Sequence, residues 1–480
     1  MHSAVSALLS SRTLWFSCVW FTVGLGYLLL LPPFQNPDEP AHFFRAYQLG
    51  LGHWEANRHE NMLGDWVACT VHGDVHRLMD LCIKQDQRIS PTSWWREARQ
   101  SVALRRTGSD PLVWANFPNT ALYAPIPYIP QIVGILVSYW TGGGVFLSLY
   151  LGRFFALLIG VVAIAYALRN LALAGESRLA FGIVACLPMT FHQVASLSAD
   201  SVLFSASFAL FATFVRLRKS CSSAPFAGYL VLAFLLSSIK FFYGLIGLMI
   251  LPSLWLKEDS WWRKWMHSGA VLAASLVPAV LWSLLVKDSF VVMRSDVFVE
   301  PWLQLQSLME HPLLFLSAVV HTDFFCMWIS AVAVFGWLSV IAPMAYIKVY
   351  SWIGLLFMIL PMDTWTGASA QKRKSAHPKM LWIFLMERLW VAALALGVMM
   401  CVHMVMYLIH TEVGANKVDG LQGRYFIPLL PLLAFAVGIR PSRLTLSAKV
   451  RSGLMYAAVG LWLATLYVPL QTLINRYWQW

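Results

Sequence analysis

The sequence predicts an all-α integral membrane protein, a polytopic helical bundle, and three observations support this fold class. Hydrophobic residues make up 59% of the 480 residues and charged residues only 12%, with a mean hydropathy of +0.63. Apolar runs recur from end to end, and each can cover a bilayer core of ~30 Å as a helix. The 23 tryptophans suit a chain with many side chains at headgroup depth. This composition excludes an ordinary soluble globular protein.

Eleven apolar runs are predicted to span the membrane, and the first begins close to the N-terminus. Residues 14–31 follow Arg12 and are longer than the core of a secretory signal. Pro32-Pro33 stands where a cleavage site would need small residues, so we expect an uncleaved first span. The other predicted spans are residues 147–169, 179–196, 201–217, 225–239, 241–256, 268–288, 343–361, 388–410, 424–439 and 453–472.

The basic residues between these runs predict how the helices are oriented. When the N-terminus is placed in the cytoplasm, every basic loop lies on the cytoplasmic side, as the positive-inside rule requires. The opposite orientation violates the rule at each loop. The formal net charge of +12 is therefore a feature of topology, and we expect no nucleic-acid partner. The basic loops comprise residues 216–219, 257–264, 371–374 and 440–451.

Two apolar segments are ambiguous. Residues 121–140 contain Pro125, Pro127 and Pro130, and they are predicted to form an external hairpin or an interfacial helix. Residues 312–341 are predicted to form either a span with a re-entrant piece or two helices on the outer surface. An even number of crossings in this second segment preserves the orientation of all later spans.

The largest hydrophilic stretch, residues 32–146, is predicted to form an extracytoplasmic loop with juxtamembrane helices. It belongs to a single membrane domain of residues 1–480, in which residues 147–480 supply the remaining helices. Unstructured loops of this length are uncommon unless they carry function. Cys69 and Cys82 lie in the loop, and an oxidising exterior favours a disulfide between them. A reduced pair or a zinc site is the alternative.

A proline-rich sequence at the start of this loop is the strongest candidate site. It reads PPFQNPDEPAHFFR, residues 32–45, and its prolines end the first helix. They leave Asp38 and Glu39 at the membrane surface, where a general base could reach an acceptor hydroxyl. Adjacent side chains diverge, so one carboxylate is expected to face a cavity, and Asp38 is our first choice. Glu39 would support this base, or bind a divalent cation (Mg²⁺ or Mn²⁺) or a structural partner.

Two more side chains of this sequence belong to the candidate site. His42 and Arg45 lie three residues apart, on one face of a helix predicted to begin after Pro40. Arg45 is expected either to pair with the acids or to contact a phosphate group. The less specific interpretation of the whole sequence is an acidic loop at the membrane interface.

An acid and a glycine-rich sequence elsewhere are predicted to lie on the same face of the membrane. Asp200 follows the third span and is expected to position the acceptor or the base, or else to cap the next helix. In DGLQGRYF, residues 419–426, two glycines let the backbone approach a ligand closely. Arg424 offers a planar fork for phosphate, next to Gln422 and Tyr425, and a helix N-terminus adds partial positive charge. An interfacial Arg-Tyr anchor is the alternative.

Lys240, at the predicted turn between the fifth and sixth spans, is a weaker candidate for the same anion. Such a lysine more often extends to the interface without a ligand.

Acids and cations together at one membrane surface suggest a substrate with a phosphate group and a lipid tail. The acids would serve an acceptor hydroxyl or a metal, and the cations would stabilise the phosphate that leaves.

These sequences resemble those of a family of bacterial polytopic membrane proteins of unknown function. The family shares a first-loop motif that PPFQNPDEPAHFFRAY, residues 32–47, resembles closely. It also shares a late motif that GLQGRYFIP, residues 420–428, resembles, and the likeness covers most of the chain.

More distantly, the layout resembles the GT-C superfamily of glycosyltransferases, multi-span enzymes that use polyprenyl-phosphate sugars. This resemblance implies that Asp38 or Glu39 acts as the base or a metal ligand, and that Asp200 is the second acid. The YAPIPY segment, residues 123–128, is similar to the proline-rich juxtamembrane helix of those enzymes. A likeness of layout does not establish function.

The sequence as a whole favours a GT-C-type membrane glycosyltransferase, on the outer face of a bacterial cytoplasmic (inner) membrane. It would move a sugar from a polyprenyl-phosphate donor to a lipid-linked or cell-envelope glycan acceptor. Its expected partners are these two substrates and membrane lipids. A transporter or flippase of lipid-linked sugars is one alternative, but two related halves are not recognisable. A polymerase or ligase of lipid-linked glycans, or a non-catalytic scaffold, is another.

Overall fold

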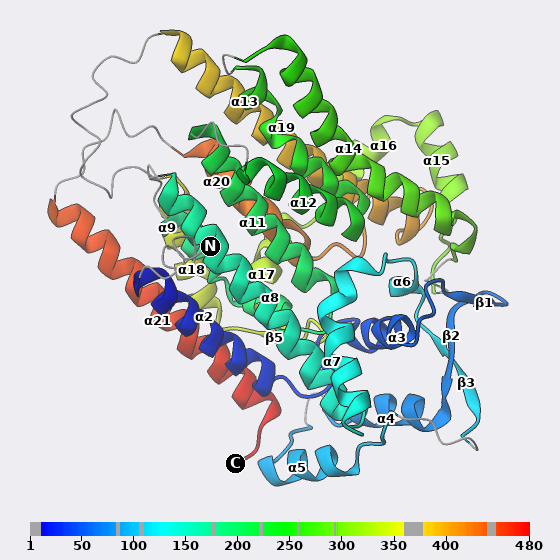
Figure 1. Cartoon of the computed structure of the whole chain (residues 1–480). Helices are drawn as coiled ribbons and strands as arrows, with labels where there is room; N and C mark the ends of the chain where they lie inside the picture. The colour runs from blue at the N-terminus through cyan, green and yellow to red at the C-terminus, as the bar shows by residue number, and fades with distance from the viewer. Residues whose placement is uncertain are drawn as a thin grey trace.

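Long apolar helices form the body of the molecule, and residues 32–144 cover one end of it, here called the loop end (Figure 1). The computed structural model describes residues 11–82, 87–104, 110–174, 179–219, 224–256, 259–291, 294, 296–359, 378–438 and 448–480. In this part of the chain, six helices are long and apolar enough to cross a membrane. They are α2 (Ser11–Leu30), α8 (Val145–Leu173), α11 (Ala199–Lys219), α14 (Trp261–Val286), α19 (Pro378–Ile409) and α21 (Ala448–Tyr477).

The other predicted spans are shorter or broken helices, so the predicted count of eleven is not confirmed. Prolines explain the breaks, because a proline fits the first turn of a helix but removes a hydrogen bond further in. Pro188, Pro252 and Pro431 each stand in the first turn of a new helix. The short helices are α9 (Leu179–Ala185), α10 (Pro188–Val194), α12 (Ala224–Ile239), η2 (Phe241–Ile250), α13 (Leu251–Trp255), α18 (Met344–Ile359), η4 (Gly423–Leu429) and α20 (Leu430–Val437).

The first ambiguous segment, residues 121–140, contains η1 (Ile126–Tyr128) and α7 (Ile129–Trp140), and α7 packs along α8. Gly134 allows this packing, because a Cβ atom there would lie 2.4 Å from the backbone nitrogen of Gly152. The second segment forms α16 (Leu313–Val320) and α17 (Phe324–Ala333), which are bent by 57° and make a seventh span only if they are counted together. A hairpin of β4 (Val334–Phe335) and β5 (Val340–Ile341) follows.

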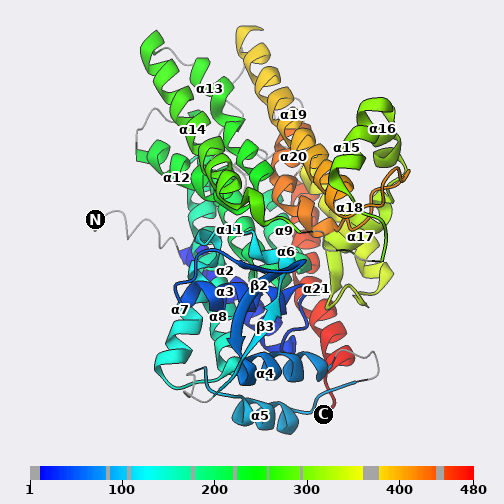
Figure 2. The ribbon, with the colours of Figure 1, turned by 90° about the vertical axis from the view of Figure 1, so that its right-hand side faces the viewer.

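A small folded region of helices and strands lies at the loop end (Figure 2). Its three strands form an antiparallel sheet in the order β1-β2-β3. Leu63 and Val67 are buried on one face of β2, whereas Trp66 pairs with Trp114 of β3 on the other. Gly64 is required there, since a Cβ atom would lie 1.9 Å from the Ala115 carbonyl oxygen. The elements are α3 (Glu39–Gly50), β1 (Asn57–His59), β2 (Met62–Ala68), α4 (Cys69–Asp80), α5 (Pro91–Gln100), β3 (Leu112–Asn116) and α6 (Pro118–Ala121).

The predicted disulfide between Cys69 and Cys82 is wrong. Both cysteines are free thiols, Cys69 exposed and Cys82 buried. Cys69 begins α4 and Cys82 follows its end, so a helix of 12 residues separates them. At about 1.5 Å per residue such a helix is roughly 18 Å long, far beyond the reach of a disulfide.

Candidate functional site

Asp38 and Glu39 point in different directions because of the backbone conformation at Asp38. Asp38 has a φ of 62°, in the left-handed region, and it is the residue before the first turn of α3. Aspartate tolerates this conformation better than most residues. Its carbonyl oxygen accepts a hydrogen bond from the His42 amide at 3.0 Å, which starts the helix. The Asp38 side chain is 40% exposed, whereas the Glu39 side chain is completely buried.

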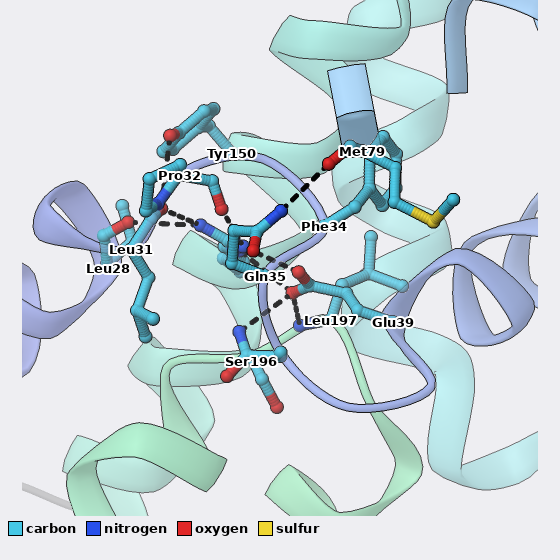
Figure 3. Close-up of polar contacts among 12 residues, drawn as sticks. Leu28, Leu31, Pro32, Phe34, Gln35, Glu39, Met79, Tyr150, Ser196 and Leu197 are labelled. Atoms are coloured by element: carbon cyan, nitrogen blue, oxygen red, sulfur yellow. Dashed lines mark hydrogen bonds and ion pairs between the residues drawn. The ribbon is translucent and has the colours of Figure 1, made fainter. Parts of the chain in front are cut away.

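Glu39 is a structural residue, so its predicted role as a supporting base or metal ligand is wrong. Its two carboxylate oxygens accept hydrogen bonds from Arg153 Nε at 2.8 Å and Arg153 Nη2 at 2.5 Å. Asn36 Nδ2 and the Leu197 amide also donate to Oε1, at 3.1 and 3.0 Å (Figure 3). Both oxygens are buried and already accept hydrogen bonds. The structure therefore shows the third predicted alternative for Glu39, a structural partner.

Arg153 is fully buried in α8 and binds more than the Glu39 carboxylate. Its Nη1 donates to the carbonyl oxygens of Leu28 and Leu31, at 3.3 and 2.7 Å. Its Nη2 donates to the carbonyl oxygen of Pro32 at 3.1 Å. Carbonyls at the end of a helix have no partner within the helix, and here an arginine satisfies them. The Glu39–Arg153 pair thus connects the end of α2, the start of α3, and α8.

Asp38 contacts two side chains from distant parts of the chain. Asn119 Nδ2 of α6 donates to Asp38 Oδ1 at 2.9 Å. Arg424 Nη2, at the start of η4, lies 3.3 Å from Asp38 Oδ2. The Arg424 side chain is only 6% exposed, and its buried Nε has no hydrogen-bond partner in the described part of the chain. Asp38 is therefore a fixed, partly accessible carboxylate beside a buried arginine with a free donor.

A second acid–cation pair lies next to the first. Lys240 Nζ lies 2.7 Å from Asp200 Oδ1, and their side chains are 12% and 7% exposed. The ammonium group is also 5.6 Å from the ring centre of Tyr123 and 5.3 Å from that of Tyr425, distances typical of cation–π contacts. The Arg424 guanidinium lies 5.6 Å from the centre of the same Tyr425 ring, which both cations therefore contact.

His42 connects the two pairs. One ring nitrogen, Nδ1, is 2.7 Å from the hydroxyl of Tyr128, and the other, Nε2, is 3.2 Å from the hydroxyl of Ser198. The Ser198 hydroxyl also accepts a hydrogen bond from the Asp200 amide at 3.1 Å. Burial lowers the pKa of His42 from 6.5 to about 4; the charges of Asp200 and Asp38 oppose this shift, whereas those of Lys240 and Arg424 add to it. The imidazole is neutral at pH 7.

Stability should depend on pH through His42. Its folded-state pKa of about 4 is below its unfolded value of 6.5, so the unfolded chain binds more protons between these pH values. Lowering the pH from 6.5 to 4 should therefore remove about 3 kcal/mol of stability, at about 1.4 kcal/mol per pKa unit. We expect His42→Gln to flatten this part of the profile, measured as the unfolding temperature in detergent between pH 4.5 and 7.5. Parallel profiles for the two proteins would contradict the assignment.

The remaining predicted residues have mixed roles. Arg45 contacts neither acid and no open space, because it is buried and donates to Gln48 Oε1 at 2.6 Å and to the carbonyl oxygens of Trp54 and Tyr123. The alternative in which Arg45 pairs with the acids is therefore wrong, and its contact with a phosphate group stays a prediction. Gln422 is next to the site, since its carbonyl oxygen accepts from the Tyr425 amide at 3.1 Å and its buried Oε1 has no partner in the described chain.

Sequence reasoning missed four residues of this arrangement: Asn119, Tyr128, Ser198 and Arg153. Among the described residues, no group of three or more His, Cys, Asp or Glu side chains could hold a metal ion. For the predicted divalent cation, this site thus offers one accessible carboxylate, that of Asp38. The zinc site considered for Cys69 and Cys82 has no ligand set among the described residues.

Comparison with known proteins identifies a family but no characterised relative. A family model described as "Predicted membrane protein (DUF2142)" matches residues 21–433. The match includes Asp38, Asp200, Lys240 and Arg424. Neither a curated protein nor a solved structure matches the chain.

Proposed function

This chain belongs to the DUF2142 family of predicted membrane proteins, and we propose that it is a glycosyltransferase that uses a polyprenyl-phosphate sugar. One observation carries the proposal: two acids and two cations meet at one end of a helical membrane protein. They come from four distant parts of the chain and form the pairs Asp38–Arg424 and Asp200–Lys240. Buried charged groups in a membrane protein are costly, and they generally mark functional sites.

The geometry suits transfer from a phosphate leaving group. Asp38, the accessible carboxylate, takes the proton of an acceptor hydroxyl as its oxygen attacks the anomeric carbon of the donor sugar. The bond between that carbon and the phosphate oxygen breaks, and polyprenyl phosphate leaves with the bonding electrons. Arg424 and Lys240 stabilise the negative charge that grows on the phosphate, as fixed cations do best in a largely water-excluded site. Asp200 holds Lys240 in place.

Transfer is tested with the purified full-length chain in lipid vesicles. The expected result is movement of labelled sugar from a polyprenyl-phosphate donor to a cell-envelope glycan, with release of polyprenyl phosphate. In cells, a deletion strain should lose one sugar from an envelope glycan while the donor accumulates. Normal glycan composition with lipid-linked glycans retained on the cytoplasmic side would contradict transfer and favour a flippase.

Arg424→Lys should reduce turnover even though it keeps the charge. Lysine loses the planar fork that binds a phosphate through two hydrogen bonds. Removing one such donor typically lowers kcat by about 10²–10³-fold. The matched control is Arg294→Lys, because Arg294 pairs with Asp296 and Asp419 at the loop end without contacting either acid of the site. An Arg424→Lys protein with unchanged turnover in the vesicle assay would exclude a role for its guanidinium in transfer.

A further inference from the structure

A groove of about 730 Å³ opens at the loop end, outside the cluster of charged residues. One wall is the β1–β2 turn, and the other is the start of α15 (Pro301–Glu310), which follows α14 and η3 (Lys287–Ser289) in the chain. Its volume is within the usual range for small-molecule sites, roughly 300–1,000 Å³. The residues that matter for its chemistry are Arg58, Asn61, Phe290, Glu300, Trp302 and Leu408.

The lining combines flat apolar faces with a few polar groups. Two aromatic side chains line the groove: Trp302, which is 61% exposed, and Phe290, which is partly buried. A sugar ring has one apolar face of C–H groups and a rim of hydroxyls, so aromatic faces beside hydrogen-bonding side chains match both of its parts. Arg58 and Asn61 are exposed on the opposite wall, where they can reach such hydroxyls.

The charges of the groove favour a neutral ligand. Arg58 on one wall and Glu300 on the other have opposite signs. Glu300 uses one oxygen, Oε2, to cap α15, accepting from the Leu303 amide at 2.6 Å, and its second oxygen is available. An anionic lipid headgroup would be repelled by Glu300 as much as it is attracted by Arg58, whereas an uncharged sugar can bond to both.

The floor of the groove is connected along the chain to the charged cluster. Leu408 is in the last turn of α19, and His410 follows the end of that helix. The His410 ring packs on Gly420, where a Cβ atom would lie 2.1 Å from its Cδ2. Gly420 is four residues before Arg424, which contacts Asp38. A ligand several sugar rings long in the groove would thus lie against a segment that continues along the chain to the candidate site.

We propose that this groove binds the acceptor glycan, a chain of neutral sugars, and holds its terminal hydroxyl toward Asp38. The role of this glycan as an acceptor rests on the proposed function. Binding of a neutral oligosaccharide, however, does not require transfer. Trp302 is the central contact, and Arg58 and Glu300 fix the hydroxyls of the sugar rings.

The test uses two readouts on the full chain in lipid nanodiscs. The first is direct binding of neutral oligosaccharides released from the cell envelope by mild acid, followed by saturation-transfer NMR. The second is the acceptor KM in the transfer assay. Trp302→Ala should weaken oligosaccharide binding and raise the acceptor KM at least tenfold, with the donor KM and the kcat at saturating acceptor unchanged. Trp95→Ala, which removes a 60% exposed tryptophan of α5, is the matched control and should change neither.

The outcomes separate this proposal from the proposed function. If Trp302→Ala transfers sugar with the acceptor KM of the wild type, the groove is not the acceptor site, although the transferase function stands. If no transfer is detected but oligosaccharide binding depends on Trp302, the glycan site stands and the transferase function fails. Absence of oligosaccharide binding to the wild type, or its displacement by anionic phospholipid vesicles alone, would overturn the assignment of the groove to a glycan.

Discussion

Asp38→Asn should abolish sugar transfer while leaving the amount of folded protein unchanged. Asparagine has the shape of aspartate and can still accept the hydrogen bond from Asn119, but it cannot take a proton. General bases contribute roughly 10²–10⁴-fold to turnover, so a loss of this size is expected. The substitution removes the charge of the Asp38–Arg424 pair, but the Asp38 side chain is 40% exposed and asparagine keeps an oxygen that can accept from Arg424, so stability should change little.

The measurement is turnover in vesicles, together with the glycan composition of cells that carry the variant in place of the wild type. The variant should reproduce the deletion strain, losing the sugar while its donor accumulates. Asp288→Asn is the control, since Asp288 is exposed just after α14 and contacts none of the four charged residues of the site. If Asp38→Asn cells have a normal glycan and deletion cells do not, Asp38 is not the base.

Breaking the Glu39–Arg153 pair should cause a large loss of stability. Both side chains are completely buried, and removing one charge leaves the other unpaired in a medium of low polarity. Glu39→Gln or Arg153→Met is expected to cost about 3–5 kcal/mol, a large fraction of a typical stability of about 5–15 kcal/mol. The readout is thermal unfolding in detergent and the yield of monodisperse protein.

A double variant and a surface pair provide the controls for this prediction. Glu39→Met combined with Arg153→Met leaves no unpaired charge, so it should be less destabilised than either single variant. Asp259→Asn breaks an exposed pair with Arg263, 3.5 Å apart, and should change stability by less than about 1 kcal/mol. Equal, additive losses in the two single variants would show that the carboxylate and the guanidinium act independently.

The fold was predictable where the length of an apolar run determines the structure, and less so elsewhere. The four longest apolar runs of the sequence became the long helices α8, α14, α19 and α21. Some shorter runs were harder to interpret, because prolines such as Pro188 and Pro252 divide them into short helices. Strand β2 had no clear pattern of alternation, since Asp65 lies between Leu63 and Val67 on its apolar face.

The candidate site was predictable in its charges but not in their partners. Asp38, Asp200, Lys240 and Arg424 stand out in the sequence because charged residues are rare in it, and the structure brings all four together. Which of two adjacent acids is accessible depends on the left-handed backbone at Asp38, a conformation that no local pattern specifies.

The partner of Glu39 illustrates why the rest could not be predicted. Arg153 is one of only two charged residues in a 29-residue apolar helix, and it is separated from Glu39 by 114 residues. Only the packing of α8 against the end of α2 brings its guanidinium to this carboxylate. Asn119, Tyr128 and Ser198 are similarly ordinary residues until tertiary structure places them around Asp38 and His42.

The Glu39–Arg153 pair also determines how this protein can be divided. A fragment of residues 32–146, the hydrophilic part that invites separate expression, would contain Glu39 but neither Arg153 nor the Leu197 amide. Glu39 would be left without its counterion Arg153, and the fragment would lose the ion pair that connects it to the helical bundle. Ligand screening and chimeras between family members must therefore keep this segment together with α8 and the residues before α11, as one inseparable unit.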